Sequence, residues 1–176
     1  MIGAMKNIIL SLLLLFPFVA CAAPEKEWTK FDVEFDEEKP WVELQSQLPA
    51  YPAEGDYLPF YVSAATPNQF YVDQKSISIG EDGVVRYTLI VKSPSGALNI
   101  SFEGMRCATA ERKLYAFGRS DGSWSKARNS KWEAIAYKDR NRYHHVLHDD
   151  FFCKGSTPVL SPEVAVNALK SAPHPK

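Results

Sequence analysis

The sequence lacks several signatures of familiar catalytic sites. It has no H-E-x-x-H zinc motif, no P-loop and no dinucleotide-binding glycine pattern. It also lacks an excess of charge of one sign, because 20 Lys and Arg stand against 21 Asp and Glu, so the whole molecule has no general attraction for nucleic acid. We therefore expect a non-enzymatic protein that uses no cofactor and binds no nucleic acid. Missing motifs leave an unfamiliar hydrolase open as an alternative.

The chain has only one long apolar run, and it lies at the N-terminus. A single positive charge precedes a nearly unbroken apolar stretch at residues 8–18, which is typical of a secretory signal and is short for a membrane span. Residues 18–21, Phe-Val-Ala-Cys, resemble the lipobox of bacterial lipoproteins, in which the cysteine carries the lipid. We expect lipidation at Cys21. Simple cleavage after Ala22 or Ala23 is the alternative.

Cysteine is scarce, and its count is consistent with export and lipidation. Of the three cysteines, Cys107 and Cys153 form the expected pair in an oxidising compartment, which leaves Cys21 for the lipid. The alternatives are two free thiols or a cysteine nucleophile, since Arg106 stands beside Cys107 and would favour a thiolate.

An acidic stretch follows the signal. Residues 25–43 contain eight acidic and three basic residues, a composition that is normally solvated. Apolar residues are interleaved with the acids, so we expect part of the stretch to dock on the domain. The predicted organisation is a signal segment at 1–21, an acidic tether at 22–40 and one globular domain at 41–172.

The rest of the chain is predicted to form mainly β-sheet. Alternating apolar residues separated by short turns, from residue 70 to about 118, predict consecutive strands, and short connections require antiparallel pairing. The apolar parity changes after Gly104, which predicts a β-bulge at that glycine with a positive φ. The fold class is α+β, a single domain of mainly antiparallel sheet with a C-terminal helix packed on it and one disulfide.

The C-terminal helix has a clear start signal. Ser161 is a good N-cap residue and the proline after it suits the first helical position, so a helix is expected to run to about residue 170. Its apolar pattern predicts that Val164 and Ala168 face inward, with Ala165 and Leu169 as further candidates.

Several local motifs resemble those of a known family. They are Gly104-x-Arg106-Cys107, Tyr115-Ala116-x-Gly118, Asp121-Gly122-x-Trp124, Trp132, Tyr143-His144 and Phe151-Phe152-Cys153 followed by a Ser-Pro-Glu helix. The pattern, over roughly residues 40–170, resembles the cryptic neisserial protein family of proteobacterial envelope proteins. The resemblance implies an exported, lipid-anchored protein of unknown biochemical function with no established catalytic residues. The expected location is the periplasm, anchored to the outer membrane of a Gram-negative bacterium.

Basic and aromatic residues gather in the second half of the domain. Between residues 106 and 142 there are ten basic and four acidic residues, a pattern suited to an anionic glycan, a lipid head group or nucleic acid, of which export makes nucleic acid the least expected. An envelope protein is a further expected partner. The alternatives are solvated charges with core aromatics, or neutralisation of this face by the acidic lead-in of the same chain. The candidate ligand face consists of Arg106, Arg119, Trp124, Trp132 and Arg142.

Two histidines have a spacing that suits metal ligation on a helix. His144 and His148 would share one helix face, at the partly wet edge of its apolar side. Exposed or hydrogen-bonded histidines without metal are the alternative interpretation. The resulting prediction is a lipid-anchored envelope protein that acts as a non-enzymatic binding or assembly component. A metal- or anion-binding periplasmic module and an envelope hydrolase are the alternatives.

Overall fold

The computed structural model describes residues 40–136 and 142–173. The expected signal segment, Cys21 and the tether up to residue 39 lie outside the described residues. A compact unit begins at Trp41. The structure has these elements: η1 (Glu54–Asp56), β1 (Tyr57–Phe60), β2 (Gln69–Asp73), β3 (Ser78–Ile79), β4 (Val84–Lys92), β5 (Leu98–Arg106), η2 (Cys107–Thr109), β6 (Glu111–Gly118), β7 (Trp124–Lys126), β8 (Trp132–Ala134), α2 (Tyr143–Val146), the π-helix η3 (Leu147–Phe152), β9 (Cys153–Lys154), β10 (Thr157–Pro158) and α3 (Pro162–Ser171).

An antiparallel sheet forms the body of the domain. Its strand order is β1-β2-β4-β5-β6-β7, with β3 paired to the start of β4 and β8 paired to the start of β6. The two nine-residue strands β4 and β5 pair along their whole length and form the centre of the sheet. All pairings are antiparallel because each connection is a turn or a short loop.

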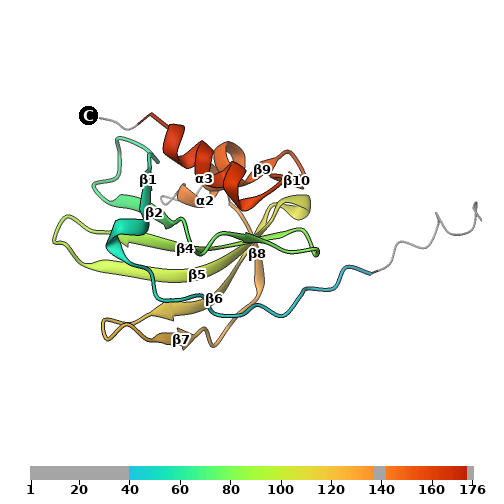
Figure 1. Ribbon diagram of the computed structural model, residues 1–176, viewed down its shortest axis with the longest axis horizontal. Coiled ribbons are helices and arrows are strands. Elements are labelled where there is room, and N and C mark those ends of the chain that lie inside the picture. Colours follow the sequence, from blue (N-terminus) through green and yellow to red (C-terminus); the bar gives the residue numbers. More distant parts are fainter. Residues whose placement is uncertain (1–39, 137–141, 174–176) are drawn as a thin grey trace, which may run out of the picture. The chain divides into compact units, whose positions relative to one another are not determined.

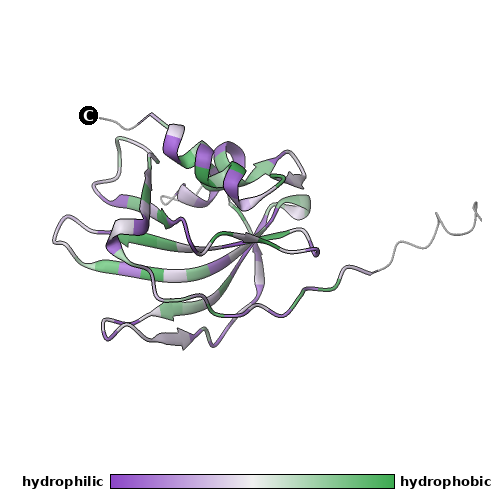
Figure 2. Cartoon of the chain, in the orientation of Figure 1, coloured by the Kyte–Doolittle hydropathy of each residue, from purple (hydrophilic) through white to green (hydrophobic). Residues whose placement is uncertain are grey.

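Helices cover one face of this sheet (Figure 1). Tyr87 and Leu89 of β4 and Met105 of β5 point to this face and pack with Leu147 and Phe152 of η3. The rings of Tyr87 and Phe152 have centroids 4.8 Å apart. Figure 2 shows hydrophobic and hydrophilic residues alternating along the strands and along α3, as expected for elements with one buried side.

The C-terminal helix begins where the sequence predicts, with Ser161 in the N-cap position and proline next to it. Ala165 and Leu169 are its fully buried residues, four positions apart. Val164, predicted to face inward, is 39% exposed, so that assignment was wrong; Ala168 packs at the margin of the core. None of the helices in the described ranges is long and apolar enough to cross a membrane.

A disulfide joins Cys107 and Cys153 across 46 residues. It ties the end of β5 to the strand that follows η3, and both half-cystines are buried in the core. The expected α+β class, antiparallel sheet, C-terminal helix and disulfide are thus confirmed.

The expected bulge lies in a different strand from the one predicted. Gly104 pairs with Arg86 on one side and Lys113 on the other, and it is absent from the glycines with positive φ. The register shifts instead between β5 and β6, where Phe102 pairs with Ala116 and the next residue pairs with Leu114. The extra residue is Tyr115. The glycine at 104 is needed for space, because a Cβ there would lie 2.5 Å from the Tyr115 Oη atom.

The apolar residues of β5 change from one face of the sheet to the other after Gly104, and this has another cause than a bulge. Glu103 and Met105 face the same side of the sheet, the helix-covered side, because Glu103 pairs with Tyr87 and Met105 with Val85. The alternation of side chains along β5 is therefore unbroken. Glu103 is a buried carboxylate, although the sequence pattern predicts a polar residue on the outer face at this position.

Candidate functional site

The face of the sheet opposite the helices is covered by the first part of the described chain. We call residues 41–51 the strap. Its partners are side chains of β4, β5, β6 and β7 that alternate with the core residues and therefore point away from the helices. Figure 1 shows this segment, in blue to cyan, running separately from α2 and α3. The docking of the lead-in expected from its interleaved apolar residues is present.

Glu43 is the main polar contact of the strap. Its Oε2 atom accepts hydrogen bonds from Lys113 Nζ at 2.6 Å and Trp132 Nε1 at 3.1 Å, and its Oε1 atom accepts one from Tyr115 Oη at 2.8 Å. Burial raises the pKa of Glu43, but these hydrogen bonds and the charge of Lys113 outweigh it and hold the pKa below its ordinary value. The strap therefore supplies an anion to the basic and aromatic face.

A second set of bonds holds Leu44 through its backbone. Asp82 Oδ2 accepts the Leu44 N–H at 2.8 Å, and Arg86 Nη2 donates to the Leu44 carbonyl at 2.9 Å. Asp82 and Arg86 also form a buried ion pair of 2.6 Å. Burial raises the pKa of Asp82, yet the bonds from Arg86, Leu44 and Val84 hold it below its ordinary value. This pair could not be predicted, because Asp82 lies in the expected turn and Arg86 at a strand position expected to be solvated.

Aromatic contacts fasten the two ends of the strap. Trp41 lies under the guanidinium of Arg106, 3.9 Å from carbon to ring centroid, and meets Trp132 edge-on at 5.8 Å. At the other end the ring of Tyr51 lies 5.5 Å from that of Trp124. Trp124 Nε1 donates to the Pro49 carbonyl at 3.0 Å.

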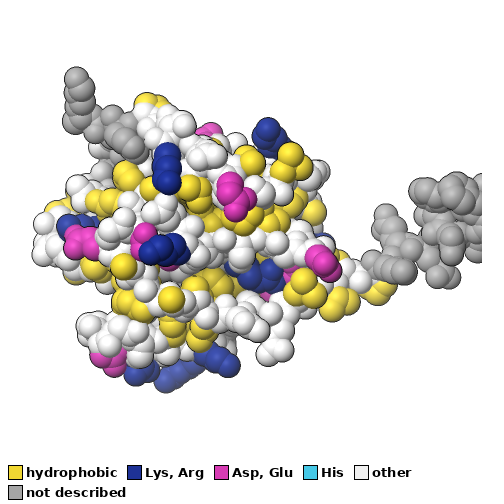
Figure 3. All heavy atoms as spheres, viewed as in Figure 1, with side chains coloured by type: hydrophobic (Ala, Val, Ile, Leu, Met, Phe, Trp, Pro, Cys, Tyr) yellow, Lys and Arg dark blue, Asp and Glu magenta, His cyan; other side chains and the backbone are white. Residues whose placement is uncertain are grey.

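The candidate ligand face is therefore in large part occupied by the strap. Arg106, Trp124 and Trp132 all contact strap residues. Arg119 is exposed. Its guanidinium donates a hydrogen bond to Ser125 Oγ, and its backbone carbonyl accepts one from the Tyr51 hydroxyl. Arg142 is not part of this group, because it precedes α2 and lines a separate hollow with His145. In Figure 3 Lys and Arg side chains gather at the lower edge, over β7.

The two candidate metal ligands have different partners. His144 Nε2 lies 2.7 Å from Glu103 Oε2 in the interior, and His144 is buried and not partly wet as expected. His148 Nδ1 lies 2.6 Å from Asp149 Oδ1. Among the described residues no three His, Cys, Asp or Glu side chains form a group that could hold a metal ion. The π-helical turn η3 begins between the two histidines and alters the face that a regular helix would give them.

Glu103 is the centre of a buried polar cluster that was not predicted from the sequence. Besides His144, it accepts hydrogen bonds from Ser101 Oγ at 2.6 Å and from Tyr87 Oη at 3.1 Å. Burial raises the pKa of Glu103, but the bonds from His144 and Ser101 and the charge of Arg112 outweigh it and hold the pKa below its ordinary value. Ser101 belongs to the same strand, but Tyr87 lies in β4 and His144 in α2, so the sequence around Glu103 gives no sign of these two partners.

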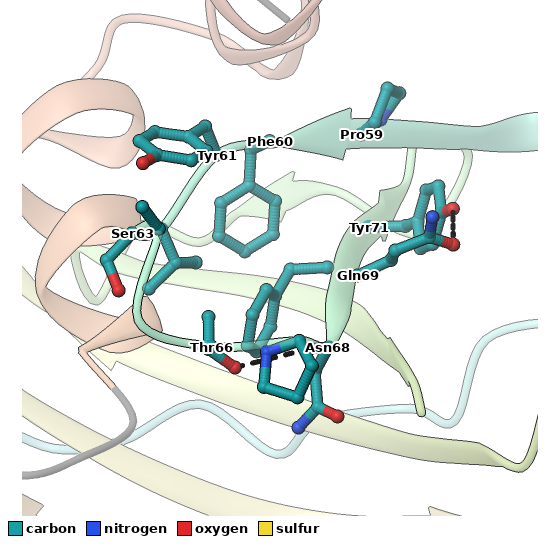
Figure 4. Close-up of a pocket in the computed structure, with 12 residues that line it drawn as sticks. Pro59, Phe60, Tyr61, Ser63, Thr66, Asn68, Gln69 and Tyr71 are labelled. Carbon is teal, nitrogen blue, oxygen red and sulfur yellow. Dashed lines mark hydrogen bonds between the residues drawn. The ribbon is translucent and has the colours of Figure 1, made fainter. Parts of the chain in front are cut away.

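The loop between β1 and β2 encloses a pocket of about 450 Å³. Figure 4 shows Phe60 and Tyr61 on one side of it and Tyr71 near Gln69 on the other. The Tyr71 hydroxyl donates to Gln69 Oε1 at 2.9 Å, so these polar groups are already paired. The pocket is mostly apolar and its walls come from one hairpin.

One short segment matches a catalytic motif in its letters alone. Residues 118–122, Gly-Arg-Ser-Asp-Gly, fit the nucleophile-elbow pattern G-x-S-x-G. That elbow requires a turn from a strand into a helix, whereas here the residues connect antiparallel strands β6 and β7. Asp121 Oδ1 accepts hydrogen bonds from the Ser123 backbone and hydroxyl, as in an ordinary hairpin turn. Ser120 therefore has the sequence spacing of a nucleophilic serine but does not lie in the strand-to-helix turn that this motif requires.

Comparisons with known proteins agree with the pattern of motifs. The sequence profile of the CNP1-like family matches residues 36–170. A curated protein named "Cryptic neisserial protein 1", from Neisseria gonorrhoeae (strain ATCC 700825 / FA 1090), is 28% identical over 100 residues. That match covers 50% of this chain and 49% of the relative, so the chain spans about half the length of the curated relative it matches. No solved structure matches. The family has no established biochemical function, and the chain belongs to the CNP1-like family.

Proposed function

We propose that this protein is an exported envelope protein, held by a lipid on Cys21 at the periplasmic side of the outer membrane of a Gram-negative bacterium. On this proposal it acts as a binding or assembly component and carries out no catalysis of its own. Its partners are the membrane and an envelope protein, glycan or lipid.

The observation that carries the proposal is the attachment of the strap. The strap begins at residue 41, directly after the acidic run expected to form a tether. Glu43 receives three hydrogen bonds, Leu44 is held through both its backbone groups, and Trp41 lies against Arg106. On this proposal, these contacts connect a membrane anchor to the sheet, so a pull on the tether is transmitted to the sheet through them.

The disulfide supports export. Cys107 and Cys153 are bonded in the core, and structural disulfides persist in oxidising compartments such as the periplasm. A binding role is supported by hollows that the strap leaves uncovered, since concave sites with a few polar groups are typical of ligand binding.

The test compares the wild-type protein with Cys21→Ala in the native host. The wild type is expected in the membrane fraction, with an intact mass equal to a chain starting at Cys21 plus its acyl groups. Cys21→Ala is expected in the soluble envelope fraction with unchanged thermal stability, because two or more acyl chains give durable attachment and an unlipidated domain has none. Ala23→Ser is the matched control and should remain with the membrane. An unmodified wild-type N-terminus at Ala23 or Pro24 would refute the anchor.

A further inference from the structure

A second hollow lies on the helix-covered face of the sheet, beyond the helices themselves. It has a volume of about 340 Å³ and is walled by β4, β5, β6 and the first residue of α2. Ligand sites are commonly 300–1,000 Å³. A hollow at the low end of this range fits one or two small rings better than a long chain.

Part of the lining of this pocket is polar and contains both donors and acceptors. Ser101 Oγ donates to Glu103 and retains lone pairs that accept hydrogen bonds. Arg112 donates through Nη2 to Glu133 at 3.0 Å, and a guanidinium has five N–H donors in total. The exposed Asn99 amide adds a donor and an acceptor. Groups that both give and receive hydrogen bonds, such as hydroxyls, match this part of the lining.

The charges in this part of the lining are already balanced. Glu103 is 4% exposed and lies against His144, and Arg112 is paired with Glu133. A strongly charged ligand would have to compete with these pairs, whereas a neutral one leaves them intact. The Glu103 carboxylate accepts three hydrogen bonds out of about four that it can take.

The rest of the lining is mainly apolar and aromatic. Leu114 lines it together with Phe117, which is 50% exposed, and Tyr143, which stacks on Phe70 at 5.3 Å. Leu98, 48% exposed, lines the same pocket, and exposed apolar side chains that gather at a hollow are typical of a ligand-binding surface.

We propose that this pocket binds a pyranose ring of a neutral glycan. A pyranose has apolar C–H groups on its ring faces, which suit Phe117 and Leu114, and hydroxyls on its rim, which suit Ser101, Asn99 and Arg112. This inference deepens the proposed binding role and names its ligand class. It does not depend on the lipid anchor.

The experiment is an NMR titration of the exported Cys21→Ala chain, which needs no detergent. The probes are cellobiose and N,N′-diacetylchitobiose, with decanoate as a single acyl chain for comparison. We expect one of the sugars to shift the amide signals of Ser101, Glu103 and Phe117 with a dissociation constant of about 1 mM, as for a small site with few contacts.

Variants then separate this pocket from the rest of the molecule. Phe117→Ala is expected to weaken sugar binding about tenfold, while Phe117→Trp, which keeps an aromatic face, retains it. Tyr61→Ala, an exposed tyrosine at the pocket in the β1–β2 loop, is the matched control and should bind like the parent.

Three outcomes would overturn the assignment. They are no shifts at ten times the expected dissociation constant, equal binding by Phe117→Ala and the parent, or shifts of the same amides by decanoate and by neither sugar. Because the titration is done in solution, a wild-type chain that proves unlipidated would refute the anchor and leave this result standing.

Discussion

Replacing Gly104 tests why β5 carries a glycine near its C-terminal end. The backbone there is ordinary paired strand, so a β-carbon introduces no φ strain. It would instead lie 2.5 Å from Oη, 2.8 Å from Cε2 and 3.0 Å from Cζ of Tyr115, where carbon contacts are normally about 3.5–4.0 Å. The Tyr115 ring must therefore move by about 1 Å.

That movement is resisted from two sides. The Tyr115 hydroxyl is bonded to Glu43 and its ring lies 5.4 Å from that of Phe102. Overpacking costs about 1–3 kcal/mol and the loss of a hydrogen bond to a charged group about 1.5 kcal/mol, so Gly104→Ala should lower the free energy of unfolding by about 2.5–4.5 kcal/mol. For a domain of this size the thermal midpoint should fall by roughly 6–15 °C, measured by circular dichroism.

Two comparisons identify the cause. Gly55→Ala is the matched control, because a β-carbon added there would have no atom within 4 Å and its φ is not positive, so it should be nearly neutral. In a Tyr115→Ala background the Gly104→Ala change should become neutral or slightly stabilising, since alanine loses less backbone entropy than glycine on folding. The space argument fails if Gly104→Ala is as mild as Gly55→Ala, or if removing the ring brings no relief.

Two further changes address the disulfide and the buried acid. Cys107→Ser should lower stability by about 4 kcal/mol from the loop closed over 46 residues, and Cys153→Ser and the double variant should behave alike; two reactive thiols in the native, unreduced wild type would contradict this. The pKa of Glu103 is held below its ordinary 4.5, so its stabilising contribution is present above that pH and is lost as the pH falls through the lowered pKa. Glu103→Gln should therefore flatten the loss of thermal stability on acidification from about pH 6 to about pH 3, and parallel curves for the two proteins would refute the role of this carboxylate.

The sequence predicted the fold better than the sites. Period-two apolar residues and short turns required an antiparallel sheet, and a serine–proline start marked α3, because these signals are local. The bulge was placed in the wrong strand because Met105 resumes an apolar pattern on the side where Glu103 is buried. Parity in one strand cannot show that a polar residue is enclosed by groups from other elements.

The site residues depended on such distant partners. Glu43 is hydrogen-bonded to Lys113 and Trp132, which lie 70 and 89 residues later in the sequence. Glu103 is hydrogen-bonded to His144, which lies 41 residues later. The sequence shows the excess of basic charge between residues 106 and 142, and the acidic lead-in is one of its expected counterparts. Nothing local identified Glu43 as the acid that docks, or Asp82 and Arg86 as the pair that holds Leu44.

The strap also sets an order of assembly. Its residues are synthesised before those of the sheet, and their polar partners follow 38 to 89 residues later, the last of them in β8. A growing chain therefore carries Trp41 and its neighbours undocked until nearly the whole sheet has formed. During that interval the aromatic residues of the strap are open to other contacts, and the basic face has not yet received Glu43. The strap is thus made before the sheet but docks among the last parts of the domain, once β8 is in place.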